Sequence, residues 1–119
     1  MPSRREQFNE FRTAMNDKIV ARGDRQINRF FNLDTQAYTD GALPGKTKEL
    51  LGLVASMVLR CDDCITYHVL ECTRGGYSDE ELFEAFNVAM IVGGSIVIPH
   101  FRRAVEVLEE IRESDTTSD

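Results

Sequence analysis

Two cysteines and a histidine lie close together in the stretch RCDDCITYH, residues 60–68. Cys61 and Cys64 are three residues apart and His68 follows four residues later, in a chain with three cysteines and two histidines. Thiols at this spacing can bind a metal ion, form a structural disulfide, or cycle between thiol and disulfide. The three interpretations differ in the geometry and the redox compartment that they require.

Helical geometry limits the metal interpretation. Spacings of three and four residues share one face of a helix, so we expect a single stripe of Cys61, Cys64, His68 and Cys72. All four cannot bind one zinc ion, because Cys61 and Cys72 would lie roughly 16 Å apart along the axis, whereas Zn–S bonds are about 2.3 Å. A three-ligand site at Cys61, Cys64 and His68, with a fourth ligand from elsewhere, remains an alternative.

A thiol pair that cycles fits the spacing better. Side chains three residues apart on a helix have Cβ atoms roughly 5 to 6 Å apart, which is close to disulfide geometry. The helix N-terminus near Cys61, the charge of Arg60, and His68 one turn from Cys64 favour the thiolate. The two aspartates between the cysteines oppose it slightly. Two small buried core cysteines are the other interpretation.

The third cysteine and the second histidine have structural interpretations. Cys72 has no cysteine within three residues, so we interpret it as a packing residue. His100 follows Pro99 at the start of the last predicted helix, where a lone histidine is more often structural than catalytic.

The composition suits one soluble domain. The 119 residues, 42% hydrophobic and 29% charged, are enough for a core and give no indication of disorder. A net charge of −6 argues against nucleic-acid binding, which depends on Lys and Arg neutralising phosphates. No basic leader opens the chain, and the apolar residues 88–99 fall short of the ~20 that a spanning helix needs. We therefore expect a cytoplasmic protein with no membrane partner, in a compartment where close cysteines are seldom permanently bridged.

Apolar residues recur at spacings of three and four, and no run alternates like a strand. We predict an all-α fold, a single-domain helical bundle of about six to seven helices over residues 1–113. Residues 1–35 would form an N-terminal helical arm or flap, residues 36–113 the redox core, and residues 114–119 a flexible tail. The predicted helices cover residues 3–22, 24–33, 46–60 and 61–74, with two more beginning near Ser78 and Ser95.

Several residues mark helix ends. Ser78, followed three residues later by Glu81, has the form of a capping box and is the clearest helix start. Pro44 is well placed to open a helix, and Ser95 can cap the last one. The pair Gly75-Gly76 would end the helix that carries the cysteines.

These residues resemble the carboxymuconolactone decarboxylase family, in its alkylhydroperoxidase D-like branch, which carries a Glu, a C-x-x-C and a following His. The similarity runs from about Tyr38 to Leu108 and includes AYTDGALPGKTKELLGLV, CDDCITYH and GGYSDEELFEAFNVAMIVGG. It implies an all-helical fold assembled as a trimer or hexamer, and reduction of peroxides or partner disulfides without a metal or bound cofactor. The lactone-decarboxylase branch generally lacks the cysteine pair, so we do not expect decarboxylation.

The resemblance also implies roles for four residues. Glu49, twelve residues before the first cysteine, would orient His68 or accept its proton. His68 would act as base toward Cys64, and Cys61 would complete the disulfide. The well-studied peroxidase members carry a second His where this chain has Asp63. A helix N-terminus favours Cys61 as the attacking thiol and the base favours Cys64, which we take as the attacking residue.

The leading hypothesis is a thiol-disulfide oxidoreductase with alkylhydroperoxidase-like or disulfide-reductase activity. Its reductant would be another dithiol protein, lipoyl-bearing or thioredoxin-like. The second hypothesis is a non-enzymatic redox sensor or assembly subunit, in which oxidation of the pair changes shape or oligomeric state. The third is the metal site described above. The apolar run over residues 88–98 also suggests a homo-oligomer.

Overall fold

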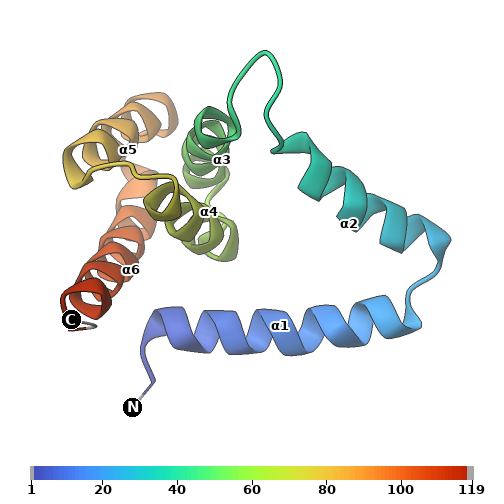
Figure 1. Ribbon diagram of the computed structural model, residues 1–119. Helices are drawn as coiled ribbons and strands as arrows, with labels where there is room; N and C mark the ends of the chain where they lie inside the picture. Colours follow the sequence, from blue (N-terminus) through green and yellow to red (C-terminus); the bar gives the residue numbers. More distant parts are fainter. Residues whose placement is uncertain (1, 118–119) are drawn as a thin grey trace.

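Apolar side chains at helical spacing draw the second half of the chain into a bundle of helices. The computed structural model describes residues 2–117, and within that range it is helical and has no strand (Figure 1). The predicted all-α single-domain fold is confirmed. The elements are α1 (Arg4–Arg22), α2 (Arg25–Ala37), α3 (Gly45–Leu59), α4 (Asp62–Arg74), α5 (Asp79–Gly93), the 3-10 helix η1 (Ser95–Val97) and α6 (Ile98–Thr117).

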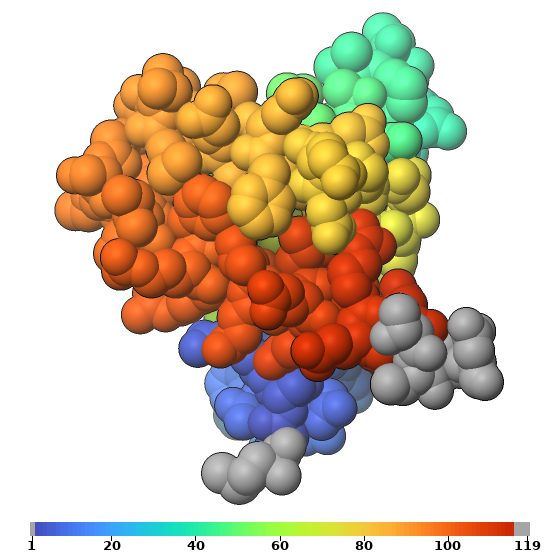
Figure 2. All heavy atoms as spheres, turned by 90° about the vertical axis from the view of Figure 1, so that its left-hand side faces the viewer, coloured from blue at the N-terminus to red at the C-terminus, as the bar shows by residue number. Residues whose placement is uncertain are grey.

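The core lies between α3, α4, α5 and α6. Leu53 and Met57 come from α3, Ile65 from α4 and Phe86 from α5, and all four are fully buried or nearly so. Burying such a side chain stabilises a fold by roughly 1.5–3 kcal/mol. Figure 2 shows α5 and α6 side by side over one face of the molecule, with α1 beneath them. This packing fixes the position of α4, which carries the cysteines.

Local capping defines where the helices begin. The Ser78 hydroxyl accepts a hydrogen bond from the Glu81 N–H, and the Glu81 carboxylate accepts one from the Ser78 N–H. The predicted capping box of α5 is therefore confirmed. Helix α3 ends at its C-terminus because the next residue, Arg60, adopts the left-handed conformation with a φ of 62°. The chain then turns directly into α4.

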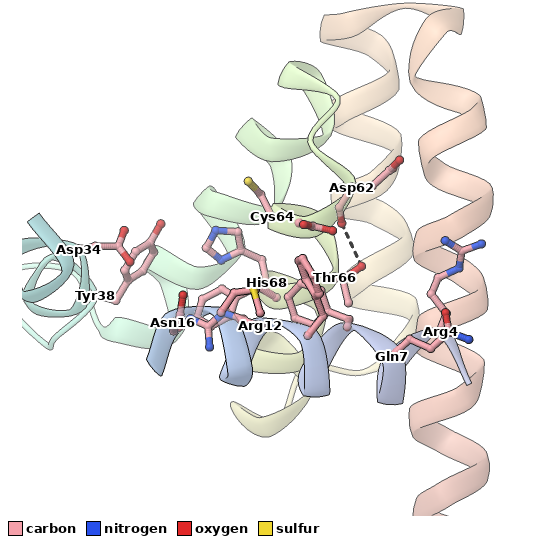
Figure 3. A pocket seen from close by; sticks show the side chains of 15 residues that line it. Arg4, Gln7, Arg12, Asn16, Asp34, Tyr38, Asp62, Cys64, Thr66 and His68 are labelled. Carbon is pink, nitrogen blue, oxygen red and sulfur yellow. Dashed lines mark hydrogen bonds between the residues drawn. The ribbon is translucent and has the colours of Figure 1, made fainter. Parts of the chain in front are cut away.

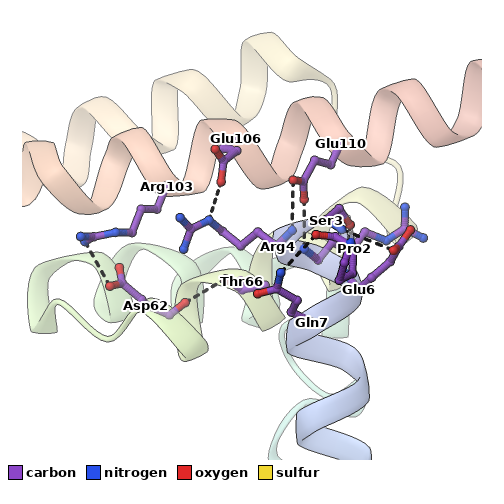
Figure 4. A network of polar contacts seen from close by, with 11 residues as sticks. Pro2, Ser3, Arg4, Glu6, Gln7, Asp62, Thr66, Arg103, Glu106 and Glu110 are labelled. Atoms are coloured by element: carbon purple, nitrogen blue, oxygen red, sulfur yellow. Dashed lines mark hydrogen bonds and ion pairs between the residues drawn. The ribbon is translucent and has the colours of Figure 1, made fainter.

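The N-terminal helices lie outside the core, and neither α1 nor α2 contains a buried residue. The start of α1 is nevertheless held against α6 by polar contacts (Figure 4). Arg4 forms an ion pair with Glu106, and the Arg5 N–H donates to Glu110 at 3.0 Å. In Figure 1, α1 starts beside the bundle, below α4 and α6, and extends beyond it, while α2 stands away from it. The division into an arm of residues 1–35 and a redox core stays a prediction, and its boundary falls inside α2, which continues to Ala37.

Two predicted boundaries of the last helix are wrong. Ser95 does not cap it: Ser95 begins η1, and the α-helix starts at Ile98. Pro99 is accepted in the first turn because its missing N–H would be unpaired there. Residues 114–117, expected in a flexible tail, are helical, since no Gly or Pro follows Ile111 to stop the helix. The rest of that predicted tail, residues 118–119, lies outside the described residues.

A helix that crosses a membrane needs roughly 20 consecutive, mostly apolar residues. In the part of the chain that the structure describes, no helix is both long and apolar enough to cross a membrane.

Candidate redox site

A disulfide joins Cys61 and Cys64 at the start of α4. Cys61 is the N-cap residue and has an extended backbone, with φ −101° and ψ 98°, so it lies just outside the helix. The two Cα atoms are 5.3 Å apart, within the range that disulfides use. Cys64 is exposed, whereas Cys61 is partly buried. The pair therefore presents Cys64, and not Cys61, to an incoming molecule.

Cys64 lies on the wall of a pocket of about 540 Å³ that opens between α1 and α4 (Figure 3). This volume is within the range of small-molecule sites. His68 lines the same pocket, so the structure brings the predicted base to the side of the exposed cysteine. The opposite wall comes from α1, which contributes Phe8, Phe11, Arg12 and Met15.

His68, which lines the pocket, forms a hydrogen-bonded pair with Glu49, which does not. The His68 Nδ1 and Glu49 Oε2 atoms are 2.8 Å apart, and the side chains are only 9% and 12% exposed. Burial raises the pKa of Glu49, and the hydrogen bond to His68 partly offsets that rise. A histidine held in this way through Nδ1 has its other ring nitrogen available for a different contact.

The predicted stripe of residues crosses from the surface of the molecule into its core. Cys64 is exposed, His68 is buried and Cys72 is fully buried. Each step of four residues turns the side chain by about 40°, so two steps carry the stripe from the surface into the core. Burial raises the pKa of Cys72 from 9.0 to about 12. The interpretation of Cys72 as a packing residue is confirmed.

His100 joins α6 to the start of α4. Its Nδ1 lies 2.8 Å from Asp62 Oδ1, and the Arg103 guanidinium donates to Asp62 Oδ2 at 3.2 Å. The Asp62 backbone oxygen also accepts from the Thr66 hydroxyl (Figure 4). A carboxylate in the first turn is favoured by the helix dipole. These contacts support the structural interpretation of His100.

The metal alternative finds no support in the geometry. Within residues 2–117, no three His, Cys, Asp or Glu side chains are placed to hold a metal ion. The sulfurs of Cys61 and Cys64, which the three-ligand alternative would use, are bonded to each other here.

Sequence reasoning missed three residues that shape the pocket, namely Tyr38, Tyr67 and Arg12. Tyr67 meets the His68 ring edge-on with centroids 5.2 Å apart, and Arg12 lies over Tyr67 at 4.6 Å from its centroid. Arg12 had a usable signal, because it lies four residues from Phe8 on the same helical face. The sequence carried no such signal for Tyr38, since only the fold brings this residue to His68.

The fold and the cysteine pair together define a small all-helical C-x-x-C protein. The model of the carboxymuconolactone decarboxylase family matches residues 27–110. The chain belongs to the carboxymuconolactone decarboxylase family. Its Glu, C-x-x-C and His are consistent with the alkylhydroperoxidase D-like branch.

Two solved structures and one curated relative are similar to this chain. A carboxymuconolactone decarboxylase family protein of Thermotoga maritima, with a suggested role in the antioxidative response, is 57% identical with a TM-score of 0.90, over 94% of this chain and 95% of that one. A family protein of Legionella pneumophila is 27% identical with a TM-score of 0.82, over 89% of this chain and 95% of the other. An uncharacterised protein in the cox locus of Paracoccus denitrificans is 34% identical over 69% of this chain and 74% of its own length.

Proposed function

We propose that the protein is a thiol-disulfide oxidoreductase that reduces organic hydroperoxides or partner disulfides through Cys61 and Cys64. The observation that carries the proposal is the exposed Cys64, disulfide-bonded to Cys61, in a pocket that is also lined by His68, whose Nδ1 is bonded to Glu49. A base beside a thiol raises the fraction of reactive thiolate. The suggested antioxidative role of the Thermotoga maritima relative supports the same chemistry.

The proposed cycle begins with the reduced pair. His68 accepts the Cys64 proton, and the thiolate attacks the outer oxygen of the hydroperoxide, breaking the O–O bond. Cys64 becomes a sulfenic acid, and the leaving alkoxide takes a proton to give the alcohol. The Cys61 thiol then attacks the sulfenic sulfur and forms the disulfide, while hydroxide leaves and is protonated to water. Two electrons pass from the dithiol to the peroxide.

A second dithiol closes the cycle by exchange. Its thiolate attacks the Cys61–Cys64 disulfide, passes through a mixed disulfide, and leaves both cysteines reduced and the donor oxidised. We propose a lipoyl-bearing or thioredoxin-like protein as this donor, in the reducing cytoplasm, where exchangeable cysteine pairs are typical. We also propose that the chain assembles with itself as a trimer or hexamer.

Steady-state peroxide reduction with a dithiol reductant tests the proposal. Cys64→Ser should abolish turnover, whereas the matched Cys72→Ser variant should keep it, because Cys72 is buried with its thiol protonated. Unchanged turnover in Cys64→Ser would remove the catalytic role. Negligible turnover of the unsubstituted protein, together with sedimentation that differs between its reduced and oxidised forms, would favour the redox-sensor hypothesis instead.

A further inference from the structure

The His68 ring lies against a glycine on the neighbouring helix. A Cβ atom at Gly52 would stand 2.6 Å from His68 Cε1 and 2.8 Å from Nε2. Separations below 3.0 Å are essentially never seen for real Cβ atoms, so any other residue at position 52 would displace the ring. Gly52 lies inside α3, where glycine is less favourable than alanine. A glycine at such a position usually has a packing reason, and here the ring supplies it.

Tyr38 lies on a second side of the space that the His68 ring occupies beside Gly52. Its hydroxyl oxygen lies 3.0 Å from the point where a Gly52 Cβ would stand, and its ring centroid is 5.5 Å from that of His68. Figure 3 shows Tyr38 and His68 next to each other on the pocket wall. Burial and the nearby Glu49 carboxylate raise the pKa of Tyr38, so the hydroxyl group beside His68 keeps its proton and carries no charge.

The remaining neighbours leave the ring little room to turn. Glu49 holds Nδ1 at 2.8 Å, and Tyr67 meets the ring edge-on at an interplanar angle of 73°. Tyr67 is itself covered by the Arg12 guanidinium. The imidazole is therefore bounded by Glu49, by two aromatic rings and by the backbone of α3 at Gly52.

We propose that Gly52 and Tyr38 are positioning residues, which hold the His68 imidazole in the one orientation that bonds Glu49 and faces the pocket of Cys64. The inference rests on the proposed relay of Glu49, His68 and Cys64. Gly52 supplies the space that the ring occupies, and Tyr38 supplies the surface that keeps it there. Neither residue touches the reacting sulfur, so both act through His68.

The imidazole resonances report the position of the ring directly, and the chain has only two histidines, His68 and His100. In Gly52→Ala, the His68 resonances should shift while those of His100 stay in place. Tyr38→Ala should also shift them, and Tyr38→Phe, which keeps the ring, should restore nearly the original spectrum. Gly41→Ala is the matched control, because a Cβ there would meet the flexible end of Lys48 at 3.6 Å.

A stability comparison separates displacement of His68 from general damage to α3. Gly52→Ala should lower the melting temperature when His68 is present and raise it in a His68→Ala background, since alanine is the better helix residue once the ring is gone. The same sign in both backgrounds would overturn the inference.

The rate of peroxide-driven disulfide formation links the result to the proposed function. Gly52→Ala should slow it by about tenfold or more, since a general base contributes roughly 10²–10⁴-fold. If the unsubstituted protein has no such reaction but the His68 resonances still shift in Gly52→Ala, the positioning stands and the proposed function fails. If Gly52→Ala leaves both the resonances and the rate unchanged, the positioning inference fails while the proposed function stands.

Discussion

Two cysteines on one helix, Cys64 and Cys72, lie in opposite surroundings. Cys64 is exposed at the mouth of a pocket beside a histidine, while Cys72, two helical turns later, is fully buried. A thiol away from water strongly prefers its neutral form, and its pKa rises accordingly. Position on the helix therefore separates an exposed cysteine, which we propose as the reactive one, from a buried cysteine that packs in the core.

The buried thiol predicts a pH effect on stability. The pKa of Cys72 is raised from 9.0 to about 12 in the folded protein, so between these values the unfolded chain loses the proton and the folded chain keeps it. Stability due to this proton is fully present below pH 9 and is lost as the pH rises toward 12. The loss is at most about 1.4 kcal/mol per pH unit.

Urea unfolding of the protein and of Cys72→Ala, compared at several pH values, measures this effect. Both proteins should carry Cys61→Ser and Cys64→Ser, so that no disulfide exchange occurs in the unfolded state. The difference in unfolding free energy should be constant below pH 9 and then shrink. A difference that stays constant to pH 11 would show that Cys72 ionises equally in both states.

For individual residues, the spacing along the sequence was enough to predict part of the candidate site. The positions of Cys61, Cys64 and His68 within one stretch indicated a shared neighbourhood, and the structure brings them together there. The role of Glu49 could be inferred only from the family resemblance. A carboxylate at the start of a helix is common, and its position does not predict a hydrogen bond to a residue 19 positions away. Tyr38 depends on the fold in the same way.

Helix α5 shows how much a single cap can contribute to an element. In the capping box, Ser78 and Glu81 satisfy each other's N–H groups, and the hydrogen bonds to Ser78 lower the pKa of the Glu81 carboxyl. The helix carries Leu82 and Phe86 into the core, so its start and the core are stabilised together.

Ser78→Ala should lower the unfolding free energy by about 1 kcal/mol, the usual cost of losing such a cap. Ser95→Ala is the control, since Ser95 is exposed at the start of η1 and should change stability by no more than about 0.5 kcal/mol. Denaturant unfolding of the three proteins gives the values. Equal effects of the two substitutions would contradict the role of the cap.

Helix existence was predictable from apolar spacing and from residues such as Ser78, because both signals are local. Helix ends without a strong breaker were not, as the extension of α6 to Thr117 shows. The placement of α1 was also beyond the sequence, because the contact of Arg4 with Glu106 joins residues 102 positions apart. That placement shapes the candidate site, since α1 forms one wall of the Cys64 pocket.

At the scale of the whole molecule, a cluster of apolar side chains remains uncovered. Ile91 and Val92 at the end of α5 are 80% and 67% exposed, and Val88 and Ile96 nearby are also exposed. Exposed apolar clusters of this kind mark interaction surfaces on soluble proteins. The cluster therefore supports the proposed self-assembly.

Replacing Ile91 with Glu would bring a charge into that contact, where desolvating it is costly. The variant should have a smaller mass in solution than the unsubstituted protein by light scattering. Thr13→Glu, at an exposed position on α1, should leave the mass unchanged. An unsubstituted protein that is already a monomer would contradict the proposed assembly, and an unaltered mass in Ile91→Glu would place the contact elsewhere.

Reaction of the cysteines with peroxide is the central chemical step of the proposed function. The direct measurement is intact and peptide mass spectrometry of the reduced protein, before and after brief exposure to one equivalent of an organic hydroperoxide. We expect rapid formation of the Cys61–Cys64 disulfide while Cys72 stays a free thiol. If both members of the pair stay reduced, or if Cys72 alone reacts, the proposed peroxide chemistry is wrong.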